Sequence, residues 1–297
     1  QLEAMKYTQG PLLVLAGAGS GKTSVITRKV AHLVQNCGIP AHRITAMTFT
    51  NKAAREMKER VGKLLSREEA KGLSVSTFHT FGLNLLRLEL KHTPLKNNFS
   101  ILDADDCKRI LMDLMHRDNL SGAESKELIA KAMRMISDWK NDLIPPEQAH
   151  TTCETAEDVQ FAHLYQLYEP NLRAYNAVDF DDLIVMPTRL LQENAEVRDK
   201  WQNRVRYLLV DEYQDTNTAQ YILVKLLVGV MGQFTAVGDD DQSIYAWRGA
   251  KPENMALLKE DFPNLKVIKL EQNYRSTSRI LKAANTVIGN NPHIFEK

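Results

Sequence analysis

The sequence predicts an α/β protein in which helices flank a parallel sheet, with an all-helical subdomain inserted into the sheet domain. Six short apolar runs have the composition of buried parallel strands, and helical patterns follow several of them, as in parallel sheets. A gap of roughly 130 residues between 77 and 207 has no convincing strand, which is far more than a crossover connection needs. The six runs are 12–16, 44–49, 73–77, 207–210, 234–237 and 265–270.

The predicted helices follow from apolar positions at helical spacing. One apolar stripe lies between 25 and 34, after the first predicted strand, and another lies between 53 and 64, after the second. Most of the gap also has a helical pattern, which a turn at Pro145 and Pro146 interrupts. The three helices predicted there are 106–116, 124–140 and 156–175.

These elements divide the chain into a sheet domain and an insertion. We place the insertion at about 88–178, so that segments 1–87 and 179–276 form the two parts of the sheet domain. The abrupt ends of the sequence lead us to expect a fragment of a longer protein, in which 277–297 begins a further domain.

Composition narrows the class of protein. Of the 297 residues, 43% are hydrophobic and 25% are charged, as in a globular protein. No stretch of about 18 uninterrupted apolar residues is present, so we expect no membrane contact. Three scattered cysteines fit a reducing, cytoplasmic compartment without disulfides or a cysteine metal site. A net charge of +1 excludes binding of nucleic acid by bulk positive charge, so such a site requires a local arrangement.

The segment AGAGSGKT, residues 16–23, has the setting of a phosphate-binding P-loop, between a predicted strand and a predicted helix. Its glycines let successive backbone N–H groups point at phosphate oxygens, and the helix N-terminus adds partial positive charge. Lys22 would reach the β- and γ-phosphates of ATP, and the Thr23 hydroxyl would coordinate Mg²⁺. The alternative is a chance glycine-rich turn. The remaining loop residues assigned to the phosphates are Ala18, Gly19, Ser20 and Gly21.

A second acidic element predicts hydrolysis. Residues 207–217, YLLVDEYQDTN, are an apolar run that ends in Asp211 and Glu212. Asp211 is placed to hold Mg²⁺, through water, and Glu212 is placed to orient and deprotonate an attacking water. The alternative is a solvated acidic turn. The pair favours hydrolysis over transfer of phosphate to another substrate.

With these elements the chain resembles the superfamily 1 DNA helicases of the UvrD/Rep type, over essentially all of its length. The resemblance implies a RecA-like motor domain with a helical insertion, and a second motor domain that begins at 277–297. It also implies 3′-to-5′ strand separation in replication restart or repair, with ATP and Mg²⁺ as cofactors. Single-stranded DNA, duplex junctions and other replication or repair proteins would be its partners. The motifs are AGAGSGKT (16–23), TFTNKAAREM (48–57), STFHTFG (76–82), DFDDLI (179–184), VDEYQDTN (210–217), VGDDDQSIYAWRGA (237–250) and LEQNYRS (270–276).

The resemblance implies further contacts with the γ-phosphate and the base. Gln242 matches the family's γ-phosphate sensor, and Arg275 matches an arginine that touches the γ-phosphate. Tyr274 matches the residue that stacks on adenine. A surface salt bridge is the alternative for Arg275, and core packing is the alternative for Tyr274.

The resemblance also places residues around the adenine. Gln1 matches the glutamine that reads the adenine edge. Most relatives have an arginine after GKT that packs on the adenine, whereas this chain has Ser24. Arg28, one helical turn further, is our candidate substitute.

The loop GDDDQSIYAWRGA, residues 238–250, combines acids with aromatic residues. We expect its acids to serve the ATP side, with no catalytic role for Asp239, Asp240 or Asp241. Tyr245 and Trp247 would stack on bases, and Arg248 would meet phosphate, a base plane or an acidic neighbour. Stacking contributes roughly 1–3 kcal/mol per base whatever the sequence. Core packing is the alternative for both rings.

Other DNA contacts are expected where two further predicted strands end. Phe49 is as consistent with base contact as with packing, and Thr77 and His79 match DNA-contacting positions in STFHTFG. A structural role is the alternative for His79. The acids of DFDDLI are expected to order neighbouring basic residues. The residues suited to a DNA phosphate at a helix N-terminus are Thr50, Asn51 and Lys52.

Several functions stay open at this point. The chain is predicted to be part of an ATP-dependent DNA helicase, in which an arginine of the second motor domain completes the catalytic site. The fragment alone is therefore expected to bind nucleotide better than it hydrolyses it. The alternatives are the motor of a helicase–nuclease, another P-loop ATPase that binds DNA, a nucleotide kinase and a nucleotide-gated DNA clamp.

Overall fold

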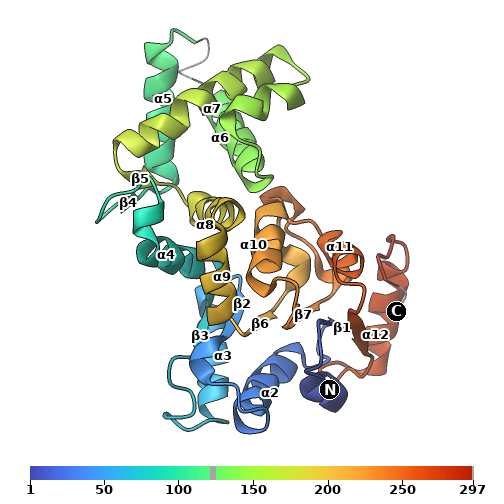
Figure 1. Ribbon diagram of the computed structural model, residues 1–297. Coiled ribbons are helices and arrows are strands. Elements are labelled where there is room, and N and C mark those ends of the chain that lie inside the picture. Colours follow the sequence, from blue (N-terminus) through green and yellow to red (C-terminus); the bar gives the residue numbers. More distant parts are fainter. Residues whose placement is uncertain (121–124, 296–297) are drawn as a thin grey trace. The chain divides into compact units, whose positions relative to one another are not determined.

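The computed structural model describes residues 1–120 and 125–295, and the chain divides into two compact units (Figure 1). The first, here called the sheet unit, comprises Gln1–Phe78, Arg198–Asn217 and Val224–Lys297. The second, here called the helical unit, comprises His79–Val197 and Thr218–Leu223. Glu124, the predicted start of one helix, and the last two residues of the predicted segment 277–297 lie outside the described residues.

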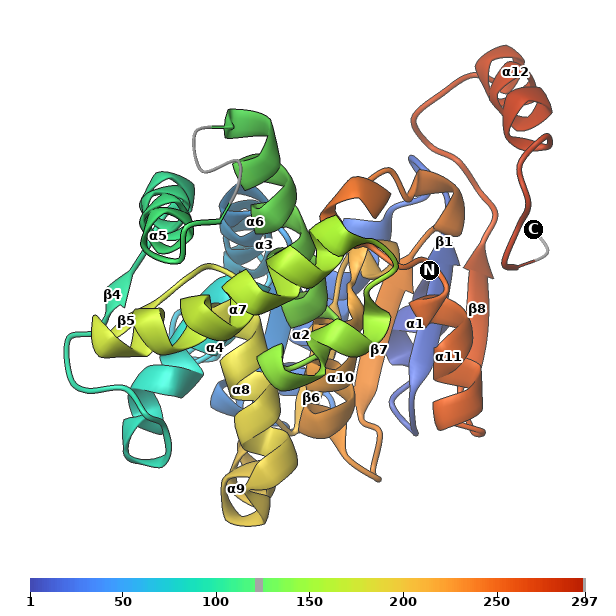
Figure 2. The same ribbon diagram turned by 90° about the horizontal axis from the view of Figure 1, so that it is seen from above.

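The sheet unit is built on a parallel sheet whose described strands follow the order β3-β2-β6-β7-β1-β8. Figure 2 shows the arrows of β7, β1 and β8 side by side. The predicted parallel sheet is confirmed, and each predicted strand end lies within one residue of the observed one. The strands are β1 (Leu12–Ala16), β2 (Ile44–Thr48), β3 (Ser74–Thr77), β6 (Tyr207–Val210), β7 (Phe234–Gly238) and β8 (Lys266–Leu270).

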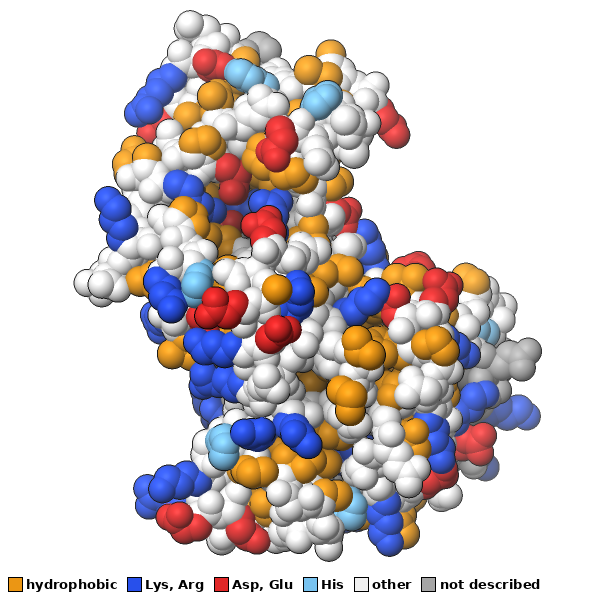
Figure 3. Space-filling model, viewed as in Figure 1, with side chains coloured by type: hydrophobic (Ala, Val, Ile, Leu, Met, Phe, Trp, Pro, Cys, Tyr) orange, Lys and Arg blue, Asp and Glu red, His pale blue; other side chains and the backbone are white. Residues whose placement is uncertain are grey.

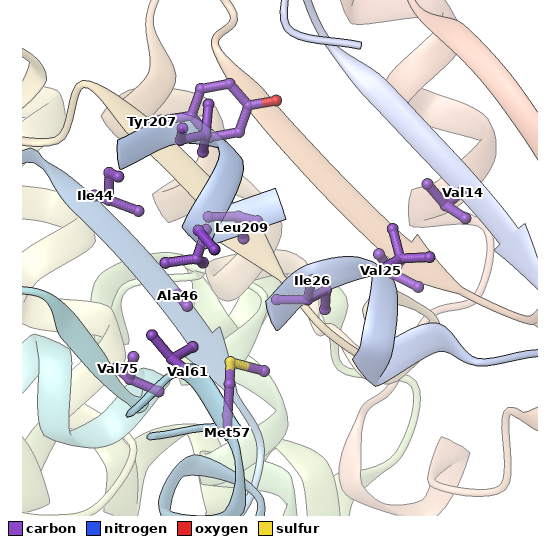
Figure 4. Close-up of a cluster of buried hydrophobic side chains, with 14 of the residues drawn as sticks. Val14, Val25, Ile26, Ile44, Ala46, Met57, Val61, Val75, Tyr207 and Leu209 are labelled. Carbon is purple, nitrogen blue, oxygen red and sulfur yellow. The ribbon is translucent and has the colours of Figure 1, made fainter. Parts of the chain in front are cut away.

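Helices pack on this sheet through the apolar stripes seen in the sequence. Val25 and Ile26 of one helix, and Met57 and Val61 of another, meet strand residues in one buried cluster (Figure 4). Fully burying a side chain of this size stabilises the fold by roughly 1.5–3 kcal/mol. The helices that lie wholly in this unit are α1 (Leu2–Lys6), α2 (Lys22–Gln35), α3 (Asn51–Gly62), α11 (Asn254–Asp261) and α12 (Ser278–Ile288).

The helical unit contains the predicted helices and a short element that the sequence does not reveal. Two-residue strands β4 (Ser100–Ile101) and β5 (Ala177–Val178) pair in parallel. The prediction of no strand in this region is therefore wrong in this detail, because two residues are too few to give a strand pattern. The helices are α4 (Phe78–Leu88), α5 (Ala104–Arg117), α6 (Lys126–Asn141), α7 (Ala156–Ala174) and α8 (Asp182–Glu193).

Two further helices, α9 (Ala195–Arg204) and α10 (Thr218–Val228), complete the set (Figure 1). The predicted turn at Pro145 and Pro146 leads into a 3-10 helix at Pro146–Thr152. Within the helical unit, α4 and α8 cross so closely that a Cβ on Gly82 would lie 1.7 Å from the carbonyl oxygen of Leu183. The domain boundaries at 88 and 178 stay predictions. No helix among the described residues is long and apolar enough to span a membrane.

A buried ionic cluster joins three helices of the helical unit. The ammonium of Lys140, which is 1% exposed, lies 2.7 Å from Glu169, 2.8 Å from Asp179 and 2.8 Å from Asp182. Arg173 adds a second cation, 2.9 Å from Asp182. Although burial lowers it, these carboxylates raise the pKa of Lys140 well above its ordinary value. The expectation that the acids of DFDDLI order basic residues is confirmed.

Candidate nucleotide and DNA site

The phosphate loop has the backbone that its sequence predicts. Strand β1 ends at Ala16, and α2 begins at Lys22. Between them Gly19 has φ 75° and Gly21 has φ 91°, a left-handed conformation that favours glycine. A Cβ on Gly19 would also lie 2.6 Å from the Cβ of Arg275. Glycine is therefore required there by backbone conformation and by space.

The strand order brings three of the four predicted catalytic residues together. Because β6, β7 and β1 are neighbours, the loops after them meet at the carboxyl edge of the sheet. The ammonium of Lys22 donates to Glu212 Oε2 at 3.1 Å and to Gln242 Oε1 at 3.0 Å. These three residues come from three segments that are distant in the sequence, so the cluster depends on the tertiary fold.

The acidic pair after β6 is arranged for a cation. Asp211 is buried, and burial followed by the charge of Glu212 raises its pKa to about 6. Burial, again followed by Glu212, raises the pKa of Asp215 to about 6 as well. The carboxyl groups of Asp211, Glu212 and Asp215 thus place excess negative charge in one small region. A bound divalent ion would offset this charge, which fits the predicted Mg²⁺ site of Asp211 and Thr23. Thr23 lies half-buried in the first turn of α2.

Glu212, the second residue of this acidic pair, has a strained backbone conformation. Its φ of 50° is left-handed, which costs a non-glycine residue of order 1–3 kcal/mol and is common at active sites. Its side chain is 39% exposed, so solvent reaches the carboxylate. The side chain of Glu212, the predicted base, is therefore partly open to solvent while its contact with Lys22 restrains it.

Gln214 is a functional residue that sequence reasoning missed. It is 1% exposed, and its Nε2 donates to Glu212 Oε2 at 2.7 Å. Its Oε1 accepts from the backbone N–H of Asp239 at 3.0 Å. A Cβ on Gly238 would lie 2.7 Å from that oxygen, so glycine leaves room for the amide. Gln214 thus ties Glu212, the predicted base, to the end of β7; its only sequence signal was its place in DEYQDTN.

The segment after β8 lies on the phosphate loop. The backbone N–H of Tyr274 donates to the carbonyl of Gly19 at 2.9 Å. Asn273, a second residue that the sequence did not single out, donates its side-chain amide to the carbonyl of Ala18. It also accepts from the backbone N–H of Arg275 at 2.9 Å. Tyr274 is 68% exposed, so the alternative of core packing is excluded for its ring.

Not every residue assigned to the adenine comes together. Gln1 lies at the loop, where its Nε2 donates to the carbonyl of Ser20 at 2.7 Å. Ser24 is half-buried in α2, and Arg28 is exposed on the same helix. Among the described residues Arg28 makes no hydrogen bond or ion pair with Gln1 or the loop. Its role as a substitute stays a prediction.

The acids of the loop 238–250 have structural partners. Asp239 is buried and accepts from the side-chain amide of Gln242 at 2.6 Å, which directs the amide oxygen of Gln242 toward Lys22. Asp241 lies 3.0 Å from the imidazole of His293, and Asp240 accepts from the backbone N–H of Ile294 at 2.9 Å. These contacts agree with the expectation that the acids have no catalytic role.

The aromatic residues of the same loop face solvent. Trp247 is 69% exposed and Tyr245 is 37% exposed, which excludes core packing. Their ring centroids are 6.3 Å apart. The guanidinium of Arg248 lies 4.5 Å from the Trp247 ring and 5.4 Å from the Tyr245 ring. This exposed cluster begins three residues after Gln242, which contacts Lys22.

The candidate DNA-binding residues at the ends of β2 and β3 differ in their exposure to solvent. Asn51 and Lys52 are exposed in the first turn of α3, and Thr50 caps that helix by accepting from the N–H of Ala53 at 3.1 Å. Phe49 is half-buried, with its ring centroid 5.2 Å from that of Phe78. Thr77 is buried at the end of β3, where a packing role is favoured.

His79 belongs to the helical unit. Its ring lies 6.0 Å from that of Phe180, which is 55% exposed. Burial lowers the pKa of His79, so its imidazole is neutral near pH 7. His79 therefore supplies no fixed positive charge.

The surface seen in Figure 3 carries basic and acidic side chains interspersed rather than one basic field. This agrees with the net charge of +1. This face therefore offers no single basic field to the backbone of a nucleic acid.

Comparison with known proteins agrees with this geometry. Residues 1–263 match the family model described as the UvrD/REP helicase N-terminal domain. Over all 297 residues the chain is 59% identical to the ATP-dependent DNA helicase Rep of Escherichia coli strain K12 and to that of Salmonella typhimurium strain LT2. Over 292 residues, 98% of the chain, it is 44% identical to the ATP-dependent DNA helicase PcrA of Staphylococcus aureus.

These matches cover nearly all of this chain but less than half of each relative. The chain spans 44% of the length of each of the two Rep proteins and 40% of the length of PcrA. The match to the family model covers most of the chain, with the P-loop, the acidic pair and the aromatic loop inside it. The chain therefore belongs to the UvrD/Rep helicase family.

Proposed function

We propose that this chain is the ATP- and single-stranded-DNA-binding part of an ATP-dependent DNA helicase. The observation that carries the proposal is the loop 238–250. Gln242 of this loop contacts the P-loop lysine, and the exposed Tyr245, Trp247 and Arg248 follow within six residues. A change at the triphosphate therefore has a short covalent route to the rings.

The nucleotide half of the mechanism follows from the cluster around Lys22. ATP entering the loop would replace Glu212 as the partner of the Lys22 ammonium, because phosphate oxygens carry more charge than one carboxylate. Glu212, still held by Gln214, would then orient and deprotonate the attacking water. Gln242 would contact the γ-phosphate, and Arg275 would stabilise the charge that develops there.

Thr23 and Asp211 are the residues that would hold Mg²⁺. An ion held there would neutralise the negative charge that develops on the phosphates. The raised pKa of the buried Asp211 indicates that the protein alone stabilises its negative charge poorly. A bound cation would stabilise that charge.

The DNA half relies on contacts that ignore sequence. Tyr245 and Trp247 would stack on bases, which suits a motor that moves along any strand. The first turn of α3 would hold a backbone phosphate through its free N–H groups and the exposed Lys52. Both elements follow carboxyl ends of parallel strands in the sheet unit.

For the whole protein we propose a second motor domain that supplies the arginine needed for fast hydrolysis. Alternating closure of the two motor domains would then drive 3′-to-5′ movement and strand separation at duplex junctions. Replication restart or DNA repair is the proposed role, with proteins of those processes as partners. These properties come from the resemblance to the family.

The proposal is tested by ATPase assays of the full-length protein, with and without single-stranded DNA of mixed sequence. We expect DNA to raise kcat at least about tenfold, and Lys22→Ala to abolish hydrolysis in both conditions. Hydrolysis that ignores DNA would favour a different P-loop enzyme. Unwinding of duplexes with a 3′ or a 5′ tail then decides between a helicase and a clamp, and fixes the polarity.

A further inference from the structure

Lys29 is a buried cation that the proposed mechanism does not use. It lies in α2, seven residues after Lys22, and is 0% exposed. Its ammonium donates to the backbone carbonyl of Ala4 at 2.9 Å and to that of Tyr7 at 2.5 Å. The ring of Tyr207 lies 5.6 Å away, a cation–π contact. No carboxylate among the described residues pairs with Lys29, which is unusual for a buried lysine.

The carbonyls that Lys29 binds belong to the C-terminal end of α1. The last carbonyls of a helix have no partner within the helix, and a cation there is favoured by the helix dipole. Burial lowers the pKa of Lys29 to about 7, because the ammonium is removed from water. Lys29 therefore satisfies two carbonyl groups at the C-terminal end of α1 from within the core.

The position of α1 depends on such contacts. A helix of five residues is not stable by itself. Ala4 is buried, but its methyl group gives little orientation. Glu3 forms an exposed ion pair with Lys266 at 2.6 Å, a type of contact that contributes little. The buried hydrogen bonds of Lys29 are thus a directional attachment of the C-terminal end of this helix.

The other end of α1 meets the phosphate loop. Gln1 precedes the helix, and its amide donates to the carbonyl of Ser20. The same amide lies over Gly21, where a Cβ would overlap it. One short helix therefore joins Lys29 to the side-chain amide that reaches the nucleotide loop.

We infer that Lys29 is a positioning residue that holds α1 so that Gln1 reads the base of the nucleotide. It sets the preference for adenine and leaves the chemical step unchanged. The inference rests on the proposed function and on the contact of Gln1 with the adenine edge that the resemblance to the family implies. A glutamine amide can pair with N6–H and N7 of adenine, whereas hypoxanthine presents an acceptor in place of the N6 donor.

The test compares ATP with ITP in the full-length protein, at saturating single-stranded DNA. In Lys29→Met we expect KM for ATP to rise about tenfold, with kcat within twofold of the wild type. KM for ITP should stay unchanged, so the preference for ATP shrinks. Gln1→Ala should have the same effect, and the double variant should lose no further preference, because both changes break one contact.

Two variants guard against a purely structural effect. Lys6→Met removes an exposed lysine of α1 itself and should behave as the wild type. Lys29→Gln keeps amide N–H donors for the two carbonyls, so it should retain part of the preference. It replaces Lys29→Met as the test if thermal melting shows that Lys29→Met does not fold.

The outcomes separate the inference from the proposed function. A wild type with DNA-stimulated ATPase, whose Lys29 variants keep the full preference or lose both nucleotides equally, overturns the inference alone. A wild type in which DNA does not stimulate hydrolysis overturns the proposed function and, with it, the inference.

Discussion

Lys22 of the sheet unit and Lys140 of the helical unit have similar partners in very different surroundings. Lys140 is 1% exposed, and three carboxylates lie within 2.8 Å of it. Lys22 is 10% exposed and contacts one carboxylate and one amide. The first cluster is closed by protein on every side. In the second, Glu212 is 39% exposed and has a left-handed backbone.

The difference shows how a lysine among side-chain oxygens serves structure in one place and a ligand in another. Around Lys140 the hydrogen bonds are complete, so removing a partner leaves uncompensated buried charge. Lys22 has few protein partners, and burial raises the pKa of a neighbouring carboxyl, that of Asp211, to about 6. A ligand that brings phosphate and a divalent cation would complete the second cluster, as we propose.

The largest expected effect is on the chemistry at the open cluster. Glu212→Gln removes the proposed base but keeps the shape of the side chain. We expect kcat of the full-length protein to fall about 10²–10⁴-fold. Binding of a nonhydrolysable ATP analogue, followed by fluorescence, should change less than about threefold. Undiminished hydrolysis would show that Glu212 is not the base.

The next effect contrasts the two lysines in stability. Lys140→Met should lower the free energy of unfolding of the helical unit by about 3–5 kcal/mol, because three carboxylates lose their central cation. Lys22→Met should cost less than about 1 kcal/mol, as expected for a partly exposed pair. Denaturant unfolding of both variants measures the difference. Equal losses would contradict the comparison.

A smaller effect concerns pH. Burial raises the pKa of Asp179 in the closed cluster to about 7, although Lys140 lowers it. A carboxyl whose pKa is raised by folding binds its proton more tightly in the folded state, so its contribution to stability falls as pH rises from about 4 to 7. The slope is at most about 1.4 kcal/mol per pH unit.

We therefore expect unfolding experiments at several pH values to show a wild type that loses stability over this window relative to Asp179→Asn. Asp182, in the same cluster, has its pKa lowered, because Lys140 and Arg173 outweigh the raising effect of burial. Its contribution is lost only as pH falls below about 4, outside this window. A difference between wild type and variant that does not change with pH would show that Asp179 stays charged throughout.

Much of the fold could be predicted because it depends on local patterns. Four strands of the sheet unit, β1, β2, β6 and β7, are buried along their whole length, and apolar runs locate all six strands within one residue. The P-loop could be placed because glycines, strand and helix are contiguous. The strands β4 and β5 could not be predicted, because each has two residues and its partner is distant in the sequence.

The missed residues have roles that arise only when distant segments meet. Gln214 and Asn273 are ordinary amides until folding places them against Asp239 and Ala18. The acids of DFDDLI were expected to order basic residues, but Lys140 lies about 40 residues away, beyond the reach of local spacing. The aromatic loop was predicted from residue types, and its exposure could come only from the structure.

If the loop 238–250 joins the triphosphate to rings that stack on DNA, nucleotide must change the affinity of the full-length protein for labelled oligo(dT). Anisotropy titrations would be made with and without a nonhydrolysable ATP analogue. The account predicts that nucleotide changes this affinity at least about fivefold. Gln242→Ala should abolish the change, and Trp247→Ala should weaken binding in both states. A nucleotide effect that survives in full in Gln242→Ala would contradict the account.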